Sequence, residues 1–299
     1  MDELPVIAIV GVTASGKSAA AVRLAHELGR PAEIINGDSM LVYRGMDIGT
    51  AKPSLAERGG VPHHLIDIMD VTEQASVAQF QVLARAAIAD CRARGVVPIV
   101  VGGSALYVHA ILDQMDFPGT DPAIRAKWAA ELDRVGAPAL HEELARRDPA
   151  AAAGILPGNG RRIVRALEVI ELNGSFTSQL PEPRYALGEV RQFGLGVPNE
   201  VLDHRIASRV QAMWQAGFVA EVEALARRGL RDGVTARRAL GYRQVLAYLD
   251  GEGTAEQALE ATVVATRQFA RKQAGWFKRD RRIEWLPYDA PYLARRMSL

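Results

Sequence analysis

The chain has 299 residues, of which 48% are hydrophobic and 24% are charged, and its formal net charge at pH 7 is +1. This composition is typical of a globular protein, and the near-neutral charge excludes a protein that binds polyanions with its whole surface. The single cysteine, Cys91, excludes an intramolecular disulfide and a cysteine-cluster zinc site, and its helical surroundings predict a buried, unreactive thiol.

The first predicted element is a buried parallel strand, "PVIAIV", which runs into the glycine-rich stretch "GVTASGKS" of residues 11–18. This stretch fits the pattern G-x-x-x-x-G-K-[ST], whose backbone N–H groups wrap phosphate oxygens. The helical pattern that follows and stops at Gly29 supplies the expected strand–loop–helix context, which a plain turn would not require. We therefore expect Lys17 to reach the outer phosphates and the Ser18 hydroxyl to contact Mg²⁺.

Further along the chain, strands are predicted in "AEIINGDS", "HHLIDIMD" and "VVPIVVGGS", with an amphipathic helix in "VAQFQVLARAAIADCRARG". Strands that alternate with helices indicate a parallel α/β sheet. Asp38 follows the second strand, and the carboxyl ends of such strands line the ligand crevice. A carboxylate beside the phosphate loop suits a general base, although "NGDS" is equally the kind of stretch in which an aspartate caps a turn.

From Phe117 the pattern changes to three successive helices, separated by Pro, Gly and Asp-Pro breaks. "RQFGLGVP" then looks like a strand that returns to the sheet, and the remainder is predicted to be helical up to Lys278. The predicted fold is thus an α/β protein with a P-loop-type parallel sheet core flanked by helices. We expect the core to comprise residues 1–116 and 190–299, with residues 117–189 as an inserted all-α domain.

Basic residues cluster outside the predicted sheet. One cluster lies at Arg161–Arg165, a second surrounds "ALGY", and a third, near the C-terminus, has Phe269, Trp276 and Trp285 among its Arg and Lys residues. Any one such cluster is more often a solvated helix face. Three of them in a near-neutral chain favour phosphate contacts and stacking on unpaired RNA bases.

Taken together, these stretches resemble one family, the bacterial tRNA dimethylallyltransferases, also called tRNA isopentenyltransferases. The similar stretches run in order along nearly the whole chain: "GVTASGKS", "NGDSMLVYRGMDIGTAKP", "PHHLIDI", "VVGGSALY", "RRIVRALEVIELNG", "MWQAGFVAEVEAL", "ALGYRQ" and "TRQFARKQAGWFKRD". The resemblance implies transfer of a dimethylallyl group from its diphosphate to the N6 amine of the adenosine 3′-adjacent to the anticodon. The phosphate loop would then hold the diphosphate of the prenyl donor instead of ATP.

The resemblance also implies roles for individual residues. The catalytic residues would be Asp38, Lys17 and Ser104, where Ser104 replaces the threonine usual in the family. The donor diphosphate would be bound by Gly11, Thr13, Ala14, Ser15, Gly16, Lys17, Ser18 and Arg209. The metal, Mg²⁺, would be held by Ser18. The tRNA would be contacted by Asp38, Ser39, Met40, Leu41, Ser104, Arg125, Arg161, Arg162, Arg165, Arg238, Gly241, Tyr242, Arg243, Arg271, Lys272, Gln273, Trp276 and Lys278.

Two other reactions fit part of the pattern. A small-metabolite kinase could use the same loop with an aspartate base, and a related enzyme could prenylate a free adenine nucleotide. The helical insertion and the basic C-terminal stretch favour a tRNA substrate, recognised through its anticodon stem-loop. The chain has no signal-peptide pattern and no apolar run of about 18 residues, so we expect a cytoplasmic enzyme, monomeric and without membrane contact.

Overall fold

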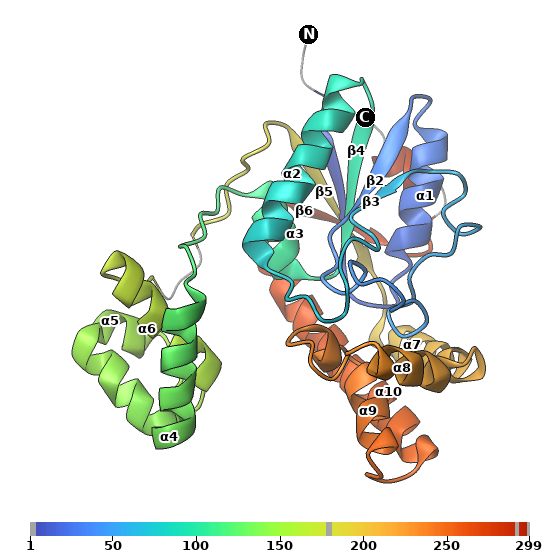
Figure 1. The fold of residues 1–299 in the computed structure, drawn as a ribbon. Helices are drawn as coiled ribbons and strands as arrows, with labels where there is room; N and C mark the ends of the chain where they lie inside the picture. Colours follow the sequence, from blue (N-terminus) through green and yellow to red (C-terminus); the bar gives the residue numbers. More distant parts are fainter. Residues whose placement is uncertain (1–3, 178–180, 291–292, 298–299) are drawn as a thin grey trace. The chain divides into compact units, whose positions relative to one another are not determined.

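The computed structural model describes residues 4–177, 181–290 and 293–297 of the chain (Figure 1). The chain divides into two compact units. The first unit combines Met1–Asp113 with Pro183–Leu299, and the second is Gln114–Glu182. The second unit therefore begins three residues earlier and ends seven residues earlier than the insertion that the sequence predicts.

The first unit is built on a six-stranded sheet in which every pair of neighbouring strands is parallel, in the order β3-β2-β4-β1-β5-β6. The strands are β1 (Val6–Val10), β2 (Ala32–Asn36), β3 (His63–His64), β4 (Val97–Gly102), β5 (Val190–Gly196) and β6 (Ile283–Pro287). β1 and β4 are buried along their whole length, as the continuous apolar runs of their sequences predict. The parallel α/β core is confirmed.

Helices cover both faces of this sheet. On one face, α2 (Val77–Ala93) and α3 (Ala105–Leu112) contribute Phe80, Ile88 and Ile111 to a core that includes Val100 of β4. On the other face, α1 (Lys17–Glu27) and α11 (Leu293–Met297) pack against the opposite side chains of β1, β4 and β5. Cys91 is fully buried in α2, as predicted.

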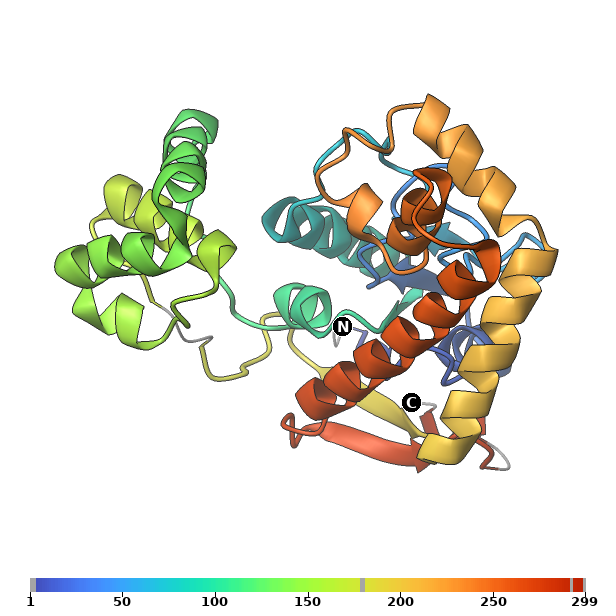
Figure 2. The same ribbon diagram turned by 90° about the horizontal axis from the view of Figure 1, so that it is seen from below.

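Four helices, α7 (Asn199–Gln215), α8 (Phe218–Arg227), α9 (Tyr242–Leu249) and α10 (Ala255–Phe277), gather at one end of the sheet (Figures 1 and 2). The helical character predicted for this part of the chain is confirmed, and the stretch from α7 to α8 is divided into two helices at Gly217. Gly217, at φ 93°, ends the first helix and begins the second. This left-handed conformation suits glycine, and it changes the direction of the chain between the two helices. The apolar seam between α7 and α10 contains Ile206, Val210 and Val263.

The second unit is entirely helical in its described residues and contains α4 (Pro122–Arg147), α5 (Pro149–Ala153) and α6 (Gly160–Asn173). Gly136 (φ 79°) interrupts α4 at the break that the sequence predicts between two helices. Trp128, Leu144 and Leu167 belong to a separate small core. Within the described part of the chain, no helix has the length and apolar character needed to cross a membrane.

Candidate active site

The phosphate loop connects β1 to α1 at the carboxyl edge of the sheet. Gly11 and Gly16 adopt φ values of 146° and 94°, and Ala14 also has a positive φ of 59°. These conformations turn successive backbone N–H groups inward, which is the arrangement that binds anions. The Lys17 ammonium group donates a hydrogen bond to the carbonyl oxygen of Val12 at 3.0 Å, and this contact holds the side chain across the loop.

Positive charge is concentrated beside this loop. Burial lowers the pKa of Lys17 to about 8, with the nearby Asp38 carboxylate opposing and the Arg209 guanidinium reinforcing the shift. Burial likewise lowers the pKa of Arg209 on α7. Among the described residues, Arg209 has no hydrogen-bonding or ion-pair partner. Two partly desolvated cations without full compensation favour a polyanionic ligand here.

Asp38 is held next to these cations by its backbone. The buried side chain of Asn36, the last residue of β2, accepts a hydrogen bond from the Asp38 N–H at 2.8 Å and donates one to its carbonyl oxygen at 2.9 Å. The Asp38 carboxylate accepts a hydrogen bond from the Met40 N–H at 2.9 Å. Its second oxygen thus remains available. Sequence analysis did not identify Asn36, although a buried amide at the end of a strand is a recognisable signal.

Two glycines at the end of β4, Gly102 and Gly103, allow neighbouring segments to pack closely around the phosphate loop. A Cβ atom on Gly102 would lie 2.4 Å from the carbonyl oxygen of Gly37, and one on Gly103 would lie 2.7 Å from Nε2 of Gln273. Gln273, on α10, accepts a hydrogen bond from the Thr13 N–H at 2.9 Å and donates one to the Gly103 carbonyl oxygen at 2.8 Å. Small residues at these positions therefore let α10 brace the phosphate loop directly.

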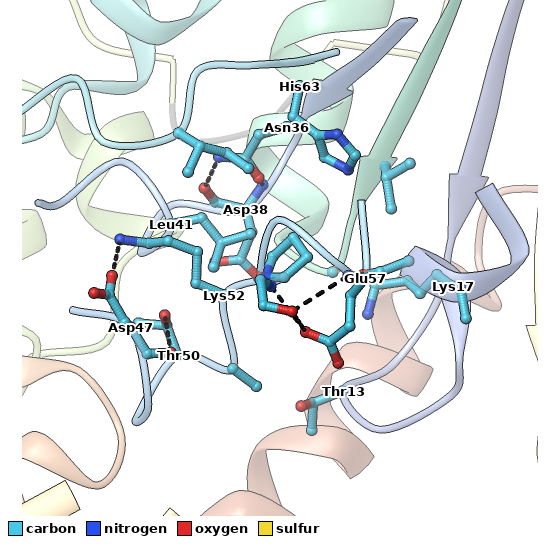
Figure 3. A pocket seen from close by; sticks show the side chains of 18 of the residues that line it. Thr13, Lys17, Asn36, Asp38, Leu41, Asp47, Thr50, Lys52, Glu57 and His63 are labelled. Carbon is cyan, nitrogen blue, oxygen red and sulfur yellow. Dashed lines mark hydrogen bonds and ion pairs between the residues drawn. The ribbon is translucent and has the colours of Figure 1, made fainter. Parts of the chain in front are cut away.

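Two cavities meet at this point (Figure 3 shows side chains that line the larger one). The larger, about 1090 Å³, is lined by the phosphate-loop residues Gly16, Lys17 and Ser18 and by the loop that follows β2. The smaller, about 250 Å³, is lined by Ser39, Met40, Ser104, Arg238 and Gly241. Both are lined by Thr13, Ala14, Asp38, Thr50, Met213, Arg209 and Phe269. Asp38 and Arg209 thus face an anion site on one side and a second binding space on the other.

A carboxylate clamp fixes the loop between these cavities. The Glu221 carboxylate, on α8, accepts hydrogen bonds from the N–H groups of Asp47, Ile48 and Gly49 at 3.0, 2.7 and 3.2 Å. It also accepts one from the Tyr242 hydroxyl at 2.5 Å. These contacts hold residues 47–49 against α8 and α9. Sequence analysis did not identify Glu221 because the partners lie far away in the chain.

A second anchor of the same loop is Lys52, whose side chain is only 4% exposed. Its ammonium group contacts the Asp47 carboxylate at 2.6 Å and the Asp67 carboxylate at 2.5 Å. It also donates a hydrogen bond to the Tyr43 carbonyl oxygen at 2.8 Å. The Asp67 carboxylate is thus the partner of a lysine.

Two of the side chains predicted to contact tRNA are buried instead. Tyr242 has no exposed surface, because its ring packs edge-on against Phe218 and its hydroxyl is used by Glu221. Gln273 is 5% exposed, and its amide is used by Thr13 and Gly103. Both side chains therefore position other parts of the site. Ser15, which is predicted to bind the donor, is 1% exposed, so only its backbone can contribute to the phosphate loop.

Three of the predicted RNA-binding arginines already have acidic partners. Arg125 and Arg165 flank the buried carboxylate of Glu168 at 2.7 and 2.9 Å, and Arg271 contacts Asp203 at 2.7 Å. Although burial alone would raise it, hydrogen bonds from Thr120, Arg125 and Arg165 lower the pKa of Glu168 to about 2. The remaining predicted cations and Trp276 are exposed: Arg161, Arg162, Arg238, Arg243, Lys272, Trp276 and Lys278.

Comparison with known proteins places this geometry in context. The family model described as IPP transferase matches residues 41–280. The chain is 59% identical to a tRNA dimethylallyltransferase of Kineococcus radiotolerans, over 98% of this chain and 95% of that protein. It is also 59% identical to the corresponding protein of Thermobifida fusca, over 97% and 92%.

Solved structures are similar as well. A full-length tRNA isopentenylpyrophosphate transferase from Bacillus halodurans is 40% identical, with a TM-score of 0.71 over 98% of this chain and 93% of that chain. A eukaryotic dimethylallyltransferase acting on tRNA is 27% identical, with a TM-score of 0.78 over 95% of this chain and 74% of that chain. The agreement extends over the whole fold.

Proposed function

Because the chain belongs to the IPP transferase family, we propose that it transfers the dimethylallyl group of dimethylallyl diphosphate to a tRNA adenosine. The acceptor would be the N6 amine of the adenosine 3′-adjacent to the anticodon, and the product N6-isopentenyladenosine. The observation that carries this proposal is the pair of cavities that share Thr13, Asp38 and Arg209. One cavity suits a diphosphate, and the other suits the base that attacks the carbon attached to it.

On the donor side, the residues stabilise the departing diphosphate. The loop amides, Lys17 and Arg209 surround the space where charge develops as the allylic C–O bond breaks. Such preorganised charge is worth several kcal/mol in the transition state, roughly 3–4 for one well-placed donor. Diphosphate takes the electron pair of the broken bond, so binding and leaving-group activation are performed by the same groups.

Mg²⁺ would fit the same cavity. Ser18 is exposed to it, and the hydroxyl there is an oxygen donor of the kind this cation prefers. When bound, the ion would neutralise diphosphate charge. Ser18 is the residue that would hold it, and the other steps depend on the side chains described above.

On the acceptor side, the N6 amine must lose a proton as its bond to carbon forms. Asp38 is the carboxylate that lines both cavities, and one of its oxygens is not used by the Met40 N–H. We assign it the role of general base, which contributes typically 10²–10⁴-fold. Ser104 also lines the smaller cavity, and its hydroxyl lies 3.3 Å from that of Ser39. It is suited to orient the amine or the ester oxygen.

The adenosine must leave its base stack to enter so small a cavity, and the enzyme would extrude it from the anticodon loop. Exposed cations in each of the two units, Arg161, Arg162 and Lys278 among them, would bind tRNA phosphates. We further propose that the enzyme acts as a monomer in the cytoplasm.

The decisive experiment is incubation of the purified protein with labelled dimethylallyl diphosphate and an unmodified tRNA, followed by nucleoside analysis. The proposal requires label in N6-isopentenyladenosine next to the anticodon. Parallel reactions with AMP as acceptor, and with ATP as donor, separate the two other reactions. Label in free nucleotide, or phosphate transfer from ATP without tRNA, would replace this proposal with one of them.

A further inference from the structure

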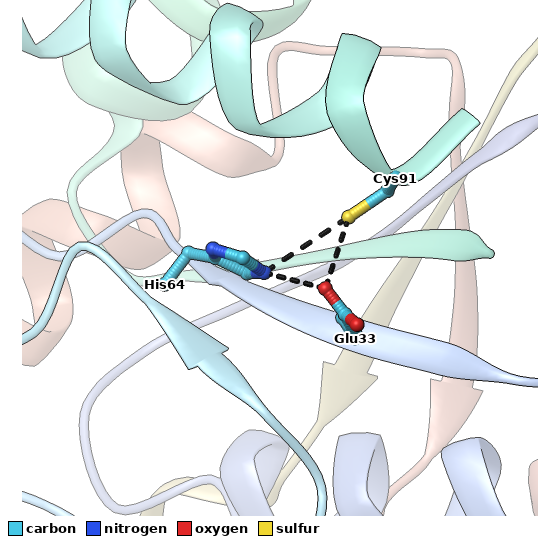
Figure 4. Close-up of side chains that lie close together, drawn as sticks. All are labelled: Glu33, His64 and Cys91. Carbon is cyan, nitrogen blue, oxygen red and sulfur yellow. Dashed lines mark hydrogen bonds and ion pairs between the residues drawn. The ribbon is translucent and has the colours of Figure 1, made fainter. Parts of the chain in front are cut away.

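A cluster of three potential metal ligands lies in the first unit, away from the proposed active site. Glu33 is the second residue of β2, at the end of the strand opposite Asp38. His64 belongs to β3, and Cys91 lies near the C-terminal end of α2. Figure 4 shows the three side chains pointing toward one another from these three elements. A carboxylate, an imidazole and a thiol are each common ligands of zinc.

The three donor atoms have nearly the spacing that a small tetrahedral metal ion requires. Glu33 Oε2 lies 2.7 Å from His64 Nε2 and 3.4 Å from Cys91 Sγ, and the sulfur lies 4.0 Å from Nε2. Zinc bonds of about 2.0–2.3 Å at tetrahedral angles place ligand atoms about 3.3–3.6 Å apart. Each observed distance is within about 0.7 Å of that range. Small side-chain rotations therefore suffice.

The cluster is only partly buried, so an ion can reach it from solvent. Cys91 is fully buried, while the side chains of Glu33 and His64 are 13% and 30% exposed. The ion would reach the sulfur from the His64 side, and water would take the fourth position. Without metal, burial raises the pKa of the Cys91 thiol to about 12, so this thiol keeps its proton.

Arg94 is the competitor for this site. Its guanidinium donates to both Glu33 oxygens at 2.8 and 2.7 Å and lowers the pKa of that carboxyl to about 2. Its side chain is 43% exposed, and it also contacts Asp90 at 2.8 Å. It also donates to the Cys91 sulfur at 3.7 Å, so binding of an ion requires it to leave both Glu33 and Cys91 while it keeps Asp90. The charges of Glu33, Asp90 and Arg94 sum to −1, and a dication with a Cys91 thiolate brings the sum to zero.

We propose that Glu33, His64 and Cys91 form a binding site for Zn²⁺ or a similar divalent ion that joins β2, β3 and α2. Binding replaces the thiol proton by metal, and one proton is released to solvent for each ion bound. The site holds the short edge strand β3 in place and takes no part in the transfer reaction.

The experiment uses the full chain, freed of metal with a chelator and titrated with Co²⁺. Cobalt bound to a thiolate gives a near-ultraviolet charge-transfer absorption, and since Cys91 is the only cysteine, the band can come from no other residue. We expect the band in the wild type, its loss on addition of Zn²⁺, and its absence in Cys91→Ser. We also expect Zn²⁺ to raise the melting temperature of the wild type but not of Cys91→Ser.

Three further variants separate a ligand set from an ordinary ion-pair network. His64→Gln should weaken Zn²⁺ binding by more than about tenfold. His204→Gln changes an exposed histidine of α7, so it controls for metal binding by histidines in general and should leave Zn²⁺ affinity unchanged. Arg94→Gln should tighten binding by up to about fivefold, because it removes the competing cation. A wild type without the cobalt band, or equal Zn²⁺ affinity in wild type, Cys91→Ser and His64→Gln, would overturn the proposal.

Discussion

Replacement of Asp38 by asparagine isolates the proposed proton transfer from every other function of the loop. Asparagine retains an oxygen for the Met40 N–H, and both contacts from Asn36 are made with the backbone of residue 38. The loop should therefore keep its shape. The change removes the basic oxygen together with its negative charge, and we expect turnover to fall by about 10²–10⁴. That range corresponds to roughly 3–5 kcal/mol of transition-state free energy.

The assay is single-turnover transfer of labelled dimethylallyl groups to an unmodified anticodon stem-loop, with tRNA affinity measured separately by filter binding. Glu57→Gln is the matched control, because it also removes one negative charge from the larger cavity. Glu57→Gln should change turnover by less than about threefold, because a high effective dielectric constant weakens the effect of a distant charge on the reaction. Near wild-type turnover in Asp38→Asn would refute the assignment of Asp38 as the base. So would an equal loss in Glu57→Gln.

The remaining predictions concern the donor site, the loop clamp and the tRNA surface. Because the pKa of Lys17 is about 8, its charge is present below that pH and lost above it. kcat/KM for the donor should fall above pH 8 in the wild type but not in Lys17→Arg. The same decrease in both proteins would exclude the titration of Lys17 as the cause of the decrease. Glu221→Gln leaves at least one of the three loop N–H groups unpaired. The free energy of unfolding should therefore fall by about 1–3 kcal/mol. KM for tRNA should also rise more than KM for the donor. Tyr242→Phe is the milder comparison, and equal stability of Glu221→Gln and wild type would contradict the clamp. tRNA affinity should fall linearly on a log–log salt plot, and Lys278→Ala should reduce the slope by about one; a flat plot would make these cations ordinary surface charges.

The phosphate loop and Asp38 were predictable because their signals are local. Eight consecutive residues encode the loop, and the position of Asp38 follows from the end of an apolar strand. The parallel sheet follows from the same alternation of strands and helices. β6 was missed because it is an edge strand, and the exposed residues Glu284 and Trp285 interrupt its apolar pattern.

The supports of the site were not predictable, because they join residues that are distant in the chain. Glu221 contacts N–H groups 172 to 174 positions away, and Gln273 contacts one 260 positions away. The stretch "ALGYRQ" gives no sign that Tyr242 faces inward while Arg243 faces outward. That difference depends on Phe218 and Glu221, against which the tyrosine packs. A motif thus identifies the segment, and the packing decides which of its side chains reach a ligand.

The same reasoning explains why a phosphate loop can serve a reaction in which no phosphoryl group moves. Under the proposed function, the backbone N–H groups of the loop and Lys17 would bind diphosphate oxygens, and they would contact the same atoms whether a P–O or a C–O bond breaks. The bond that breaks is selected by what stands opposite the loop. Here Asp38 and Arg209 form the wall between the anion site and a cavity of about 250 Å³ that suits a single base. Under the proposed function, a nucleophile held beside Ser39, Met40 and Ser104 would meet the carbon end of the donor, because the phosphates would be turned toward the loop.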